Sequence, residues 1–329
     1  MHDDELFDVE ADVPEAFSAV APTRDAAEDD LLATENVVGV GLGYKITGGV
    51  QTDKPSVMVL VEQKLPPELL SGKPVPKTIG GKPTDLMEVG VLQAGGDAEP
   101  AAEVGVQKLA TRVRPARPGY SIGHLKVTAG TLGAGAYDLR GTVPGKPPRY
   151  YALSNNHVLA NSNDAKIGDP IIQPGAFDGG TFPADVIGRL ARYVPIKFDG
   201  TTNLVDAAIA EVPFDTIDRD IYWTGYPQSL VKAAQVGMVL KKTGRTTHFT
   251  TGRVTALNAT VNVNYGGGKV AKFGRQIVTT DMSAGGDSGS LVLDLQNNPV
   301  GLLFAGSSTA TILNPIAYVQ RLLGVRLWP

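Results

Sequence analysis

Short apolar runs alternate with turn residues in this chain from about residue 106 onward. Glycine (39 residues) and proline (23 residues) are spread along the chain, as expected where many short strands are joined by turns. The pattern predicts a β-sandwich or β-barrel. One helix should follow, between Pro315 at an early helical position and Gly324 at its end. The expected strands are 131–139, 150–153, 170–173, 185–190, 205–212, 238–243, 252–258, 276–280, 290–295 and 299–305.

The first 105 residues have a different pattern. Residues 1–33 predict an acidic leader with a short helix capped by Thr23. Residues 34–105 predict a small α+β module and linker, followed by one barrel domain over 106–329. The module of roughly 60 residues is marginal for independent stability, so it should pack on the barrels or on another subunit, which would make a homo-oligomer. Its expected parts are strands at 37–44 and 56–62 with a Gly-Gly turn at 48–49, a short helix from 66, and a linker over 93–105.

Three glycines in the first of these strands, Gly39, Gly41 and Gly43, match a dinucleotide-binding fingerprint only in part. The following helix and the full spacing are missing. We favour the alternative, a strand whose glycines let another backbone approach closely.

Composition and charge narrow the function classes. The chain is 42% hydrophobic and 19% charged, as in ordinary globular proteins. A formal net charge of −4 argues against a basic nucleic-acid-binding surface, and no apolar run is long enough to span a bilayer. There is no cysteine, and the acidic N-terminus lacks the features of a signal peptide. We therefore expect a cytoplasmic protein without a nucleic-acid or membrane partner.

The strongest chemical signal is Gly-Gly-Asp-Ser-Gly-Ser-Leu-Val at 285–292. A serine hydroxyl becomes a useful nucleophile only when a base takes its proton and donors stabilise the oxyanion. Glycines allow consecutive backbone N–H groups to turn inward. The motif predicts Ser288 as nucleophile and the N–H groups of Gly286 and Ser288 as oxyanion hole. The non-catalytic alternative is a solvent-facing serine in a glycine-rich turn, which would have the same sequence.

A candidate base is found among only four histidines, His2, His124, His157 and His248. His157 ends the segment Tyr-Ala-Leu-Ser-Asn-Asn-His at 151–157, where a strand gives way to small polar residues. This context places an imidazole at the rim of a barrel. The non-catalytic alternative is a partly buried histidine bonded to the backbone.

A carboxylate partner is predicted at Asp206, which begins the apolar segment 206–212. A buried carboxylate needs a strong partner, and an imidazole N–H is a good one. Asp199 is a weaker candidate for this carboxylate because Phe-Asp-Gly at 198–200 looks like a surface turn. Glu211 lies further along the same strand and could be a salt-bridge residue. The chain order His157, Asp206, Ser288 is that of the chymotrypsin arrangement and differs from the subtilisin and α/β-hydrolase orders.

Residues from about 112 to 329 resemble trypsin-like serine peptidases. The segments at 114–133, 154–157 (Ser-Asn-Asn-His) and 36–45 are similar to bacterial relatives of the plant narrow-leaf proteins. The resemblance implies a mainly β fold, a chymotrypsin-like double β-barrel with a C-terminal helix, preceded by the small α+β module. It places the active site between two six-stranded barrels. It implies a serine endopeptidase that acts on a protein or peptide through an acyl-enzyme, without a cofactor or metal.

The resemblance also suggests a partner for Asp287. In trypsin the aspartate before the nucleophile pairs with an N-terminus made by cleavage, but no activation site is evident here. The segment Lys-Thr-Gly-Arg-Thr-Thr at 242–247 is similar to the streptogrisin and α-lytic type, in which an arginine fills that role. Arg245 is the expected partner of Asp287, with an exposed turn arginine as the alternative.

The specificity pocket is expected from the segment before the serine and from the strand after it. With the common loop length, apolar Met282 forms the floor and Gly306 leaves the wall open, so an uncharged, medium-sized side chain enters. A shift of one residue would place Asp281 at the floor and favour a basic residue. We favour Met282. The candidate pocket residues are Asp281, Met282, Phe304, Ala305 and Gly306.

Two other functions use the same residues. One is an esterase with the same triad, although no lid-like segment is present. The other is a non-catalytic binding or scaffold protein on a protease fold, against which an intact triad argues.

Overall fold

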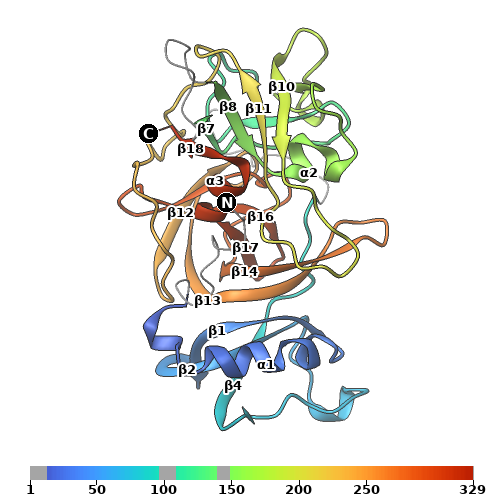
Figure 1. The fold of residues 1–329 in the computed structure, drawn as a ribbon, viewed down its shortest axis with the longest axis vertical. Coiled ribbons are helices and arrows are strands. Elements are labelled where there is room, and N and C mark those ends of the chain that lie inside the picture. The colour runs from blue at the N-terminus through green and yellow to red at the C-terminus, as the bar shows by residue number, and fades with distance from the viewer. Residues whose placement is uncertain (1–12, 96–108, 139–148, 329) are drawn as a thin grey trace, which may run out of the picture.

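The computed structural model describes residues 13–95, 109–138 and 149–328. Strands dominate, and two curled sheets lie one above the other with the N-terminal elements below them (Figure 1). Within the described residues, no helix is long and apolar enough to cross a membrane. The helices are α1 (Ala21–Leu32), α2 (Asn156–Leu159) and α3 (Ile316–Leu323), and short 3-10 turns lie at Glu15–Phe17, Pro67–Leu69, Asn161–Asn163 and Ala176–Asp178.

The first barrel is a sheet in the order β18-β7-β8-β11-β10-β9-β5-β6. Only Leu132 and Gly133 separate β6, at one end of this order, from β7, next to the other end. The sheet therefore closes on itself. Its strands are β5 (Ser121–His124), β6 (Gly130–Thr131), β7 (Ala134–Asp138), β8 (Tyr150–Ser154), β9 (Pro170–Ile172), β10 (Val186–Tyr193), β11 (Ala208–Val212) and β18 (Val325–Leu327).

The second barrel has the order β12-β15-β16-β17-β14-β13, and a further pairing of β12 with β13 closes it. The two barrels confirm the predicted mainly β, chymotrypsin-like double barrel. The strands are β12 (Val239–Gly244), β13 (His248–Asn264), β14 (Val270–Thr280), β15 (Leu291–Asp294), β16 (Pro299–Gly306) and β17 (Ala310–Pro315).

A shared hydrophobic core fixes the barrels relative to each other. It combines Leu153 and Ile209 of the first barrel with Leu291 and Leu302 of the second, and α3 adds Val319. Burying such side chains contributes roughly 1.5–3 kcal/mol each, so the cleft between the barrels has rigid walls. Helix α3 ends at Gly324, as predicted, in the left-handed conformation with φ 66°.

The N-terminal strands extend the sheet of the second barrel. β1 (Val37–Thr47) and β2 (Val50–Val61) form the predicted hairpin, and β1 pairs with β13. A Cβ on Gly39 would lie 2.9 Å from the carbonyl oxygen of Thr260, so the glycine strand allows the close backbone approach expected from the sequence. The remaining strands are β3 (Thr78–Ile79) and β4 (Lys82–Glu88), of which β4 runs parallel to β2.

Helix α1 covers this extended sheet (Figure 1). It starts at Ala21 with Val20 as its N-cap, so the prediction of Thr23 as the cap is wrong. Buried Arg24 donates to Thr260 Oγ1 at 2.6 Å and pairs with Glu28 at 2.6 Å. The polar contact ties the helix to β13.

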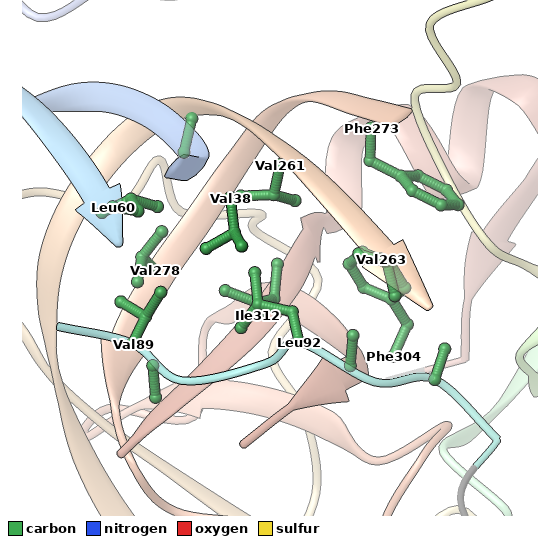
Figure 2. Packing of buried hydrophobic residues seen from close by; sticks show 14 of the residues in the cluster. Val38, Leu60, Val89, Leu92, Val261, Val263, Phe273, Val278, Phe304 and Ile312 are labelled. Atoms are coloured by element: carbon green, nitrogen blue, oxygen red, sulfur yellow. The ribbon is translucent and has the colours of Figure 1, made fainter. Parts of the chain in front are cut away.

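After β4 the chain enters the second barrel. Val89 and Leu92 pack among Val263, Phe304 and Ile312 (Figure 2). Of the predicted linker 93–105, only residues 93–95 belong to the described residues.

Candidate active site

Two neighbouring strands bring the candidate histidine and aspartate together. β8 and β11 are antiparallel, with Ser154 opposite Ala208. Residues that follow Ser154 therefore lie at the same barrel end as residues that precede Ala208. His157 sits on the single turn α2, and Asp206 lies two residues before β11. The amide of Asn155 donates to the carbonyl oxygen of Asp206 at 2.7 Å and holds the two segments together.

The imidazole of His157 and the carboxylate of Asp206 form a short, buried hydrogen bond. Nδ1 of His157 lies 2.6 Å from Oδ2 of Asp206, and the His157 backbone N–H donates to Oδ1 at 3.2 Å. Asp206 is completely buried and His157 is 5% exposed. An ionised carboxylate only accepts, so Nδ1 carries the proton and Nε2 keeps its lone pair. Within the described part of the chain, Nε2 has no hydrogen-bond partner.

The other carboxylates considered from the sequence lie elsewhere. Asp199 is in an exposed turn and accepts a hydrogen bond from the Thr201 N–H. Glu211 is exposed and lies 3.5 Å from Arg149.

A third side chain, Tyr265, contacts the same carboxylate. Its hydroxyl donates to Oδ2 of Asp206 at 2.7 Å, and its ring meets the His157 ring edge-on with centroids 6.1 Å apart. Burial, and then the charge of Asp206, raises the pKa of Tyr265 well above its ordinary value. The phenol therefore stays protonated and serves as a donor. Tyr265 is a site residue that the sequence interpretation missed.

Ser288 lies in the loop between β14 and β15, on the other side of the cleft. It lines a cavity of about 230 Å³ together with His157, Tyr265 and Gly286. Its carbonyl oxygen accepts from the N–H of Thr131 on β6 at 2.8 Å. This bond connects the serine loop to the first barrel.

The backbone around Ser288 has the orientation that an oxyanion hole requires. In a trans peptide the C=O and the next N–H point in opposite directions. The carbonyl of Gly285 accepts from Thr246 Oγ1 at 2.7 Å, and that of Asp287 accepts from Ser290 Oγ at 2.6 Å. These hydrogen bonds direct the two carbonyls toward the side chains of Thr246 and Ser290. The N–H groups of Gly286 and Ser288 therefore point in the opposite direction, away from these side chains. Neither N–H has an acceptor in the described residues.

Gly286 is required at its position. Its φ is +99°, and a Cβ there would lie 2.5 Å from Thr246 Oγ1. A side chain would be strained and would displace the hydroxyl that holds the Gly285 carbonyl.

The predicted ion pair of Arg245 with Asp287 is wrong. Asp287 is completely buried and pairs with Lys242, whose Nζ lies 2.9 Å from Oδ2. Oδ1 accepts from the Thr246 N–H at 2.8 Å, and Thr247 Oγ1 donates to Oδ2 at 2.5 Å. Lys242 lies on β12 and its side chain is completely buried. A lysine therefore neutralises this buried charge.

Arg245 has a different role. Its Nε donates to Asp178 Oδ2 at 2.9 Å, and both side chains are buried. Asp178 belongs to the first barrel and Arg245 follows β12 of the second. The pair links the barrels behind Gly286.

Sequence comparison identifies relatives. A family model of the trypsin-like peptidase domain matches residues 141–302. Glutamyl endopeptidase 2 of Streptomyces griseus is 32% identical over 189 residues, which are 55% of this chain and 86% of the relative. The chain belongs to the trypsin-like serine peptidases. It is a serine-type endopeptidase with a His-Asp-Ser triad, as the sequence predicted.

The peptidase is also similar to a second curated protein and to two solved structures. Serine protease 1 of Streptomyces fradiae is 33% identical over 162 residues, 47% of this chain but only 38% of that protein. The structure of Nocardiopsis protease has a TM-score of 0.47 at 17% identity, covering 65% of this chain and all of that one. Cellulomonas bogoriensis chymotrypsin has a TM-score of 0.45 at 19% identity, covering 65% of this chain and 98% of that one.

The pocket of the peptidase differs from the predicted pocket. Met282 is 3% exposed and packs against Gly252 and the core of the second barrel, so it is not the floor of the pocket. Phe304 is fully buried in another core cluster, and Asp281 is exposed. A cavity of about 490 Å³ next to the serine is lined by Gln93, Gly95, Ser283, Ala284, Gly285, Ser288, Leu303, Ala305, Gly306, Ser307 and Ser308.

Only Ala305 and Gly306 of the predicted pocket residues line this cavity. Among the described residues that line it, none carries a charged side chain. Ser283 Oγ lies 2.7 Å from Thr311 Oγ1 beside it. Within the described residues, no three His, Asp or Glu side chains gather as a metal site would need.

Proposed function

We propose that Ser288 attacks the peptide carbonyl, with His157 as general base and Asp206 as the carboxylate that orients it. The observation that carries this proposal is the buried 2.6 Å contact of His157 Nδ1 with Asp206 in a cavity shared with Ser288. It leaves Nε2 as the only basic nitrogen of the ring, at the cavity that holds the serine.

The reaction proceeds in two halves. His157 takes the proton of the Ser288 hydroxyl as the oxygen bonds to the carbonyl carbon, and the N–H groups of Gly286 and Ser288 stabilise the oxyanion. His157 returns the proton to the leaving amine, which gives the acyl-enzyme. Water then repeats the sequence and releases the acid. Asp206 stabilises the imidazolium in both halves and stays ionised.

The substrate we propose is an extended polypeptide with an uncharged, small to medium side chain before the cleaved bond. None of the described residues that line the cavity beside Ser288 carries a charge, so these residues offer a buried lysine or arginine no ion-pair partner. A glutamate is the second candidate, because the hydroxyl of Ser283 can donate to a carboxylate when it accepts from Thr311 Oγ1, and one relative is a glutamyl endopeptidase.

A fluorophosphonate probe tests the nucleophile directly. The full chain should gain one covalent adduct, mapped to Ser288 by mass spectrometry, and His157→Ala should label far more slowly. A panel of matched peptide amides and esters separates a peptidase from an esterase. Labelling at another serine, or equal labelling of the His157→Ala variant, would contradict the proposed roles.

A further inference from the structure

The segment Gln93–Gly95 lies in the cleft as an additional strand. The N–H of Gln93 donates to the carbonyl of Gly306 at 3.0 Å, and the N–H of Gly306 donates back at 3.0 Å, in an antiparallel bridge. On its other side, the N–H of Ala94 donates to the carbonyl of Asn264 at 3.0 Å. The segment is thus bonded through its backbone to β16 and to the end of β13.

This edge of β16 is where a peptide substrate would need to bind. Ala305 and Gly306 border the same cavity as Ser288. Extended peptides bind at free sheet edges by exchanging backbone hydrogen bonds, largely independently of their side chains. Both backbone bonds that Gly306 could offer to such a peptide are taken by Gln93.

The chain continues from this bridge towards the triad. A Cβ on Gly95 would lie 3.5 Å from Cδ2 of His157, and Gly95 lines both cavities that Ser288 lines. Two residues after the pairing with Gly306, the segment is therefore beside the catalytic histidine. The segment therefore extends from the β16 edge to the triad, the space that an extended substrate would have to enter.

Buried side chains anchor the segment. Leu92 is 1% exposed and packs with Val263, Phe304 and Ile312, as Figure 2 shows. Ala94 is also buried. The anchor keeps Gln93 at a high local concentration at the edge of β16.

We propose that Gln93–Gly95 is an internal, substrate-like strand that competes with peptide substrates for the β16 edge and restrains the activity of the full chain. The inference rests on the proposed function of Ser288. The N-terminal module would thus regulate the peptidase through the segment that follows it.

The test compares the full chain with its Gln93→Pro variant, which lacks the N–H donor to Gly306. The substrate is acetyl-Leu-Gln-Ala-Gly coupled to aminomethylcoumarin, which repeats residues 92–95. Weakening an internal competitor should lower KM at unchanged kcat and raise kcat/KM by roughly tenfold, the factor expected when a backbone hydrogen bond is lost. Val91→Ala is the control, because the Val91 side chain is exposed and lines neither cavity of the site, so this variant should behave like the wild type.

Ala94→Pro, which removes the donor to Asn264, is a second variant with the same expected direction. If neither proline variant folds, hydrogen exchange on the wild type decides. The amides of Gln93 and Ala94 should exchange faster when acetyl-Leu-Gln-Ala-glycinal occupies the cleft, or the aldehyde should fail to bind although the fluorophosphonate labels Ser288.

The inference would be overturned if the folded proline variants had the same KM as the wild type. It would also be overturned if the amides of Gln93 and Ala94 still exchanged slowly in the aldehyde complex. A chain that neither cleaves the peptide nor labels with fluorophosphonate in any variant would instead overturn the proposed function. The two failures are therefore distinguishable.

Discussion

Tyr265 and Asp206 are joined by a hydrogen bond of 2.7 Å, which ends on the carboxylate oxygen that also lies 2.6 Å from His157 Nδ1. Two donors thus converge on one buried oxygen. The phenol holds this carboxylate oxygen in place beside the imidazole. Tyr265 is a positioning residue for the triad.

The Tyr265→Phe variant should lose about tenfold in kcat with little change in KM, because the phenol acts through Asp206 and a typical hydrogen bond to a charged group contributes about 1.5–3 kcal/mol. The loss should therefore appear in kcat and not in KM. Steady-state kinetics measures both constants.

Tyr151→Phe is the matched control. Tyr151 also donates to an aspartate, Asp138, at 3.0 Å, and its pKa is raised to about 12 by burial and that hydrogen bond. It is not among the residues that line the cavities of the site. Its loss should leave kcat unchanged. Identical kcat values for both variants and the wild type would show that Tyr265 only fills space.

Thr246 should orient the oxyanion hole through the Gly285 carbonyl, which it holds at 2.7 Å. Thr246→Val removes the donor at nearly constant shape, so the Gly286 N–H loses its fixed direction and kcat should fall by about tenfold, less than the roughly 10²-fold loss of a direct oxyanion donor. Thr250→Val removes a similar bond, 2.7 Å to the Met282 carbonyl, and should keep the wild-type kcat. Equal kcat for the two variants would count against this role.

The Lys242–Asp287 pair should be essential for stability. Lys242→Met leaves a fully buried carboxylate without its cation and should cost about 3–5 kcal/mol in the free energy of unfolding. Lys269→Met breaks an exposed contact with Asp164 at 3.9 Å and should cost at most about 1 kcal/mol. Urea unfolding of both variants gives the comparison, and similar costs would contradict the assignment.

The same pair predicts acid sensitivity. Burial alone would raise the pKa of Asp287, but the charge of Lys242 and the bonds from Thr247 and Thr246 hold this pKa below its ordinary value. The resulting stability is present above the unfolded-state value of about 3.9 and is lost as the pH falls through the lower folded-state value. Unfolding free energies measured from pH 5 downward should therefore fall less steeply for Asp287→Asn than for the wild type.

The cavity beside Ser288 predicts cleavage after uncharged residues. A peptide panel that varies this position among Ala, Leu, Glu and Lys should give the lowest kcat/KM for Lys. Asp281 is exposed and outside the cavity, so Asp281→Asn should leave the order of preference unchanged. If the protein cleaved chiefly after Lys and lost this preference in Asp281→Asn, Asp281 would instead form the floor of the pocket.

The fold and the triad candidates were predictable because their signals are local. Apolar runs between turns predict strands, and the glycine turn around Ser288 and the rim setting of His157 occur within a few residues. The prediction that Arg245 pairs with Asp287 was wrong because it relied on the resemblance to other peptidases. Strand alternation offered the better signal, since Lys242 shares the inward face of Leu240 on β12.

The remaining site features depend on distant contacts. Met282 is buried because β13 presents Gly252 beside it, where a Cβ would lie 2.7 Å from the methionine sulfur. Tyr265 reaches Asp206 from 59 residues further along the chain. Gln93 reaches Gly306 only because the second barrel encloses Leu92. No local pattern encodes these approaches.

The most direct test of the account is the hydrolysis rate of Ser288→Ala on a peptide that the full chain cleaves. Loss of the nucleophile should lower kcat by at least roughly 10⁴-fold, while the thermal unfolding temperature stays within a few degrees of the wild type, because Ser288 Oγ makes no hydrogen bond within the described residues. A Ser288→Ala protein that still cleaves the peptide at the wild-type rate would contradict the central claim.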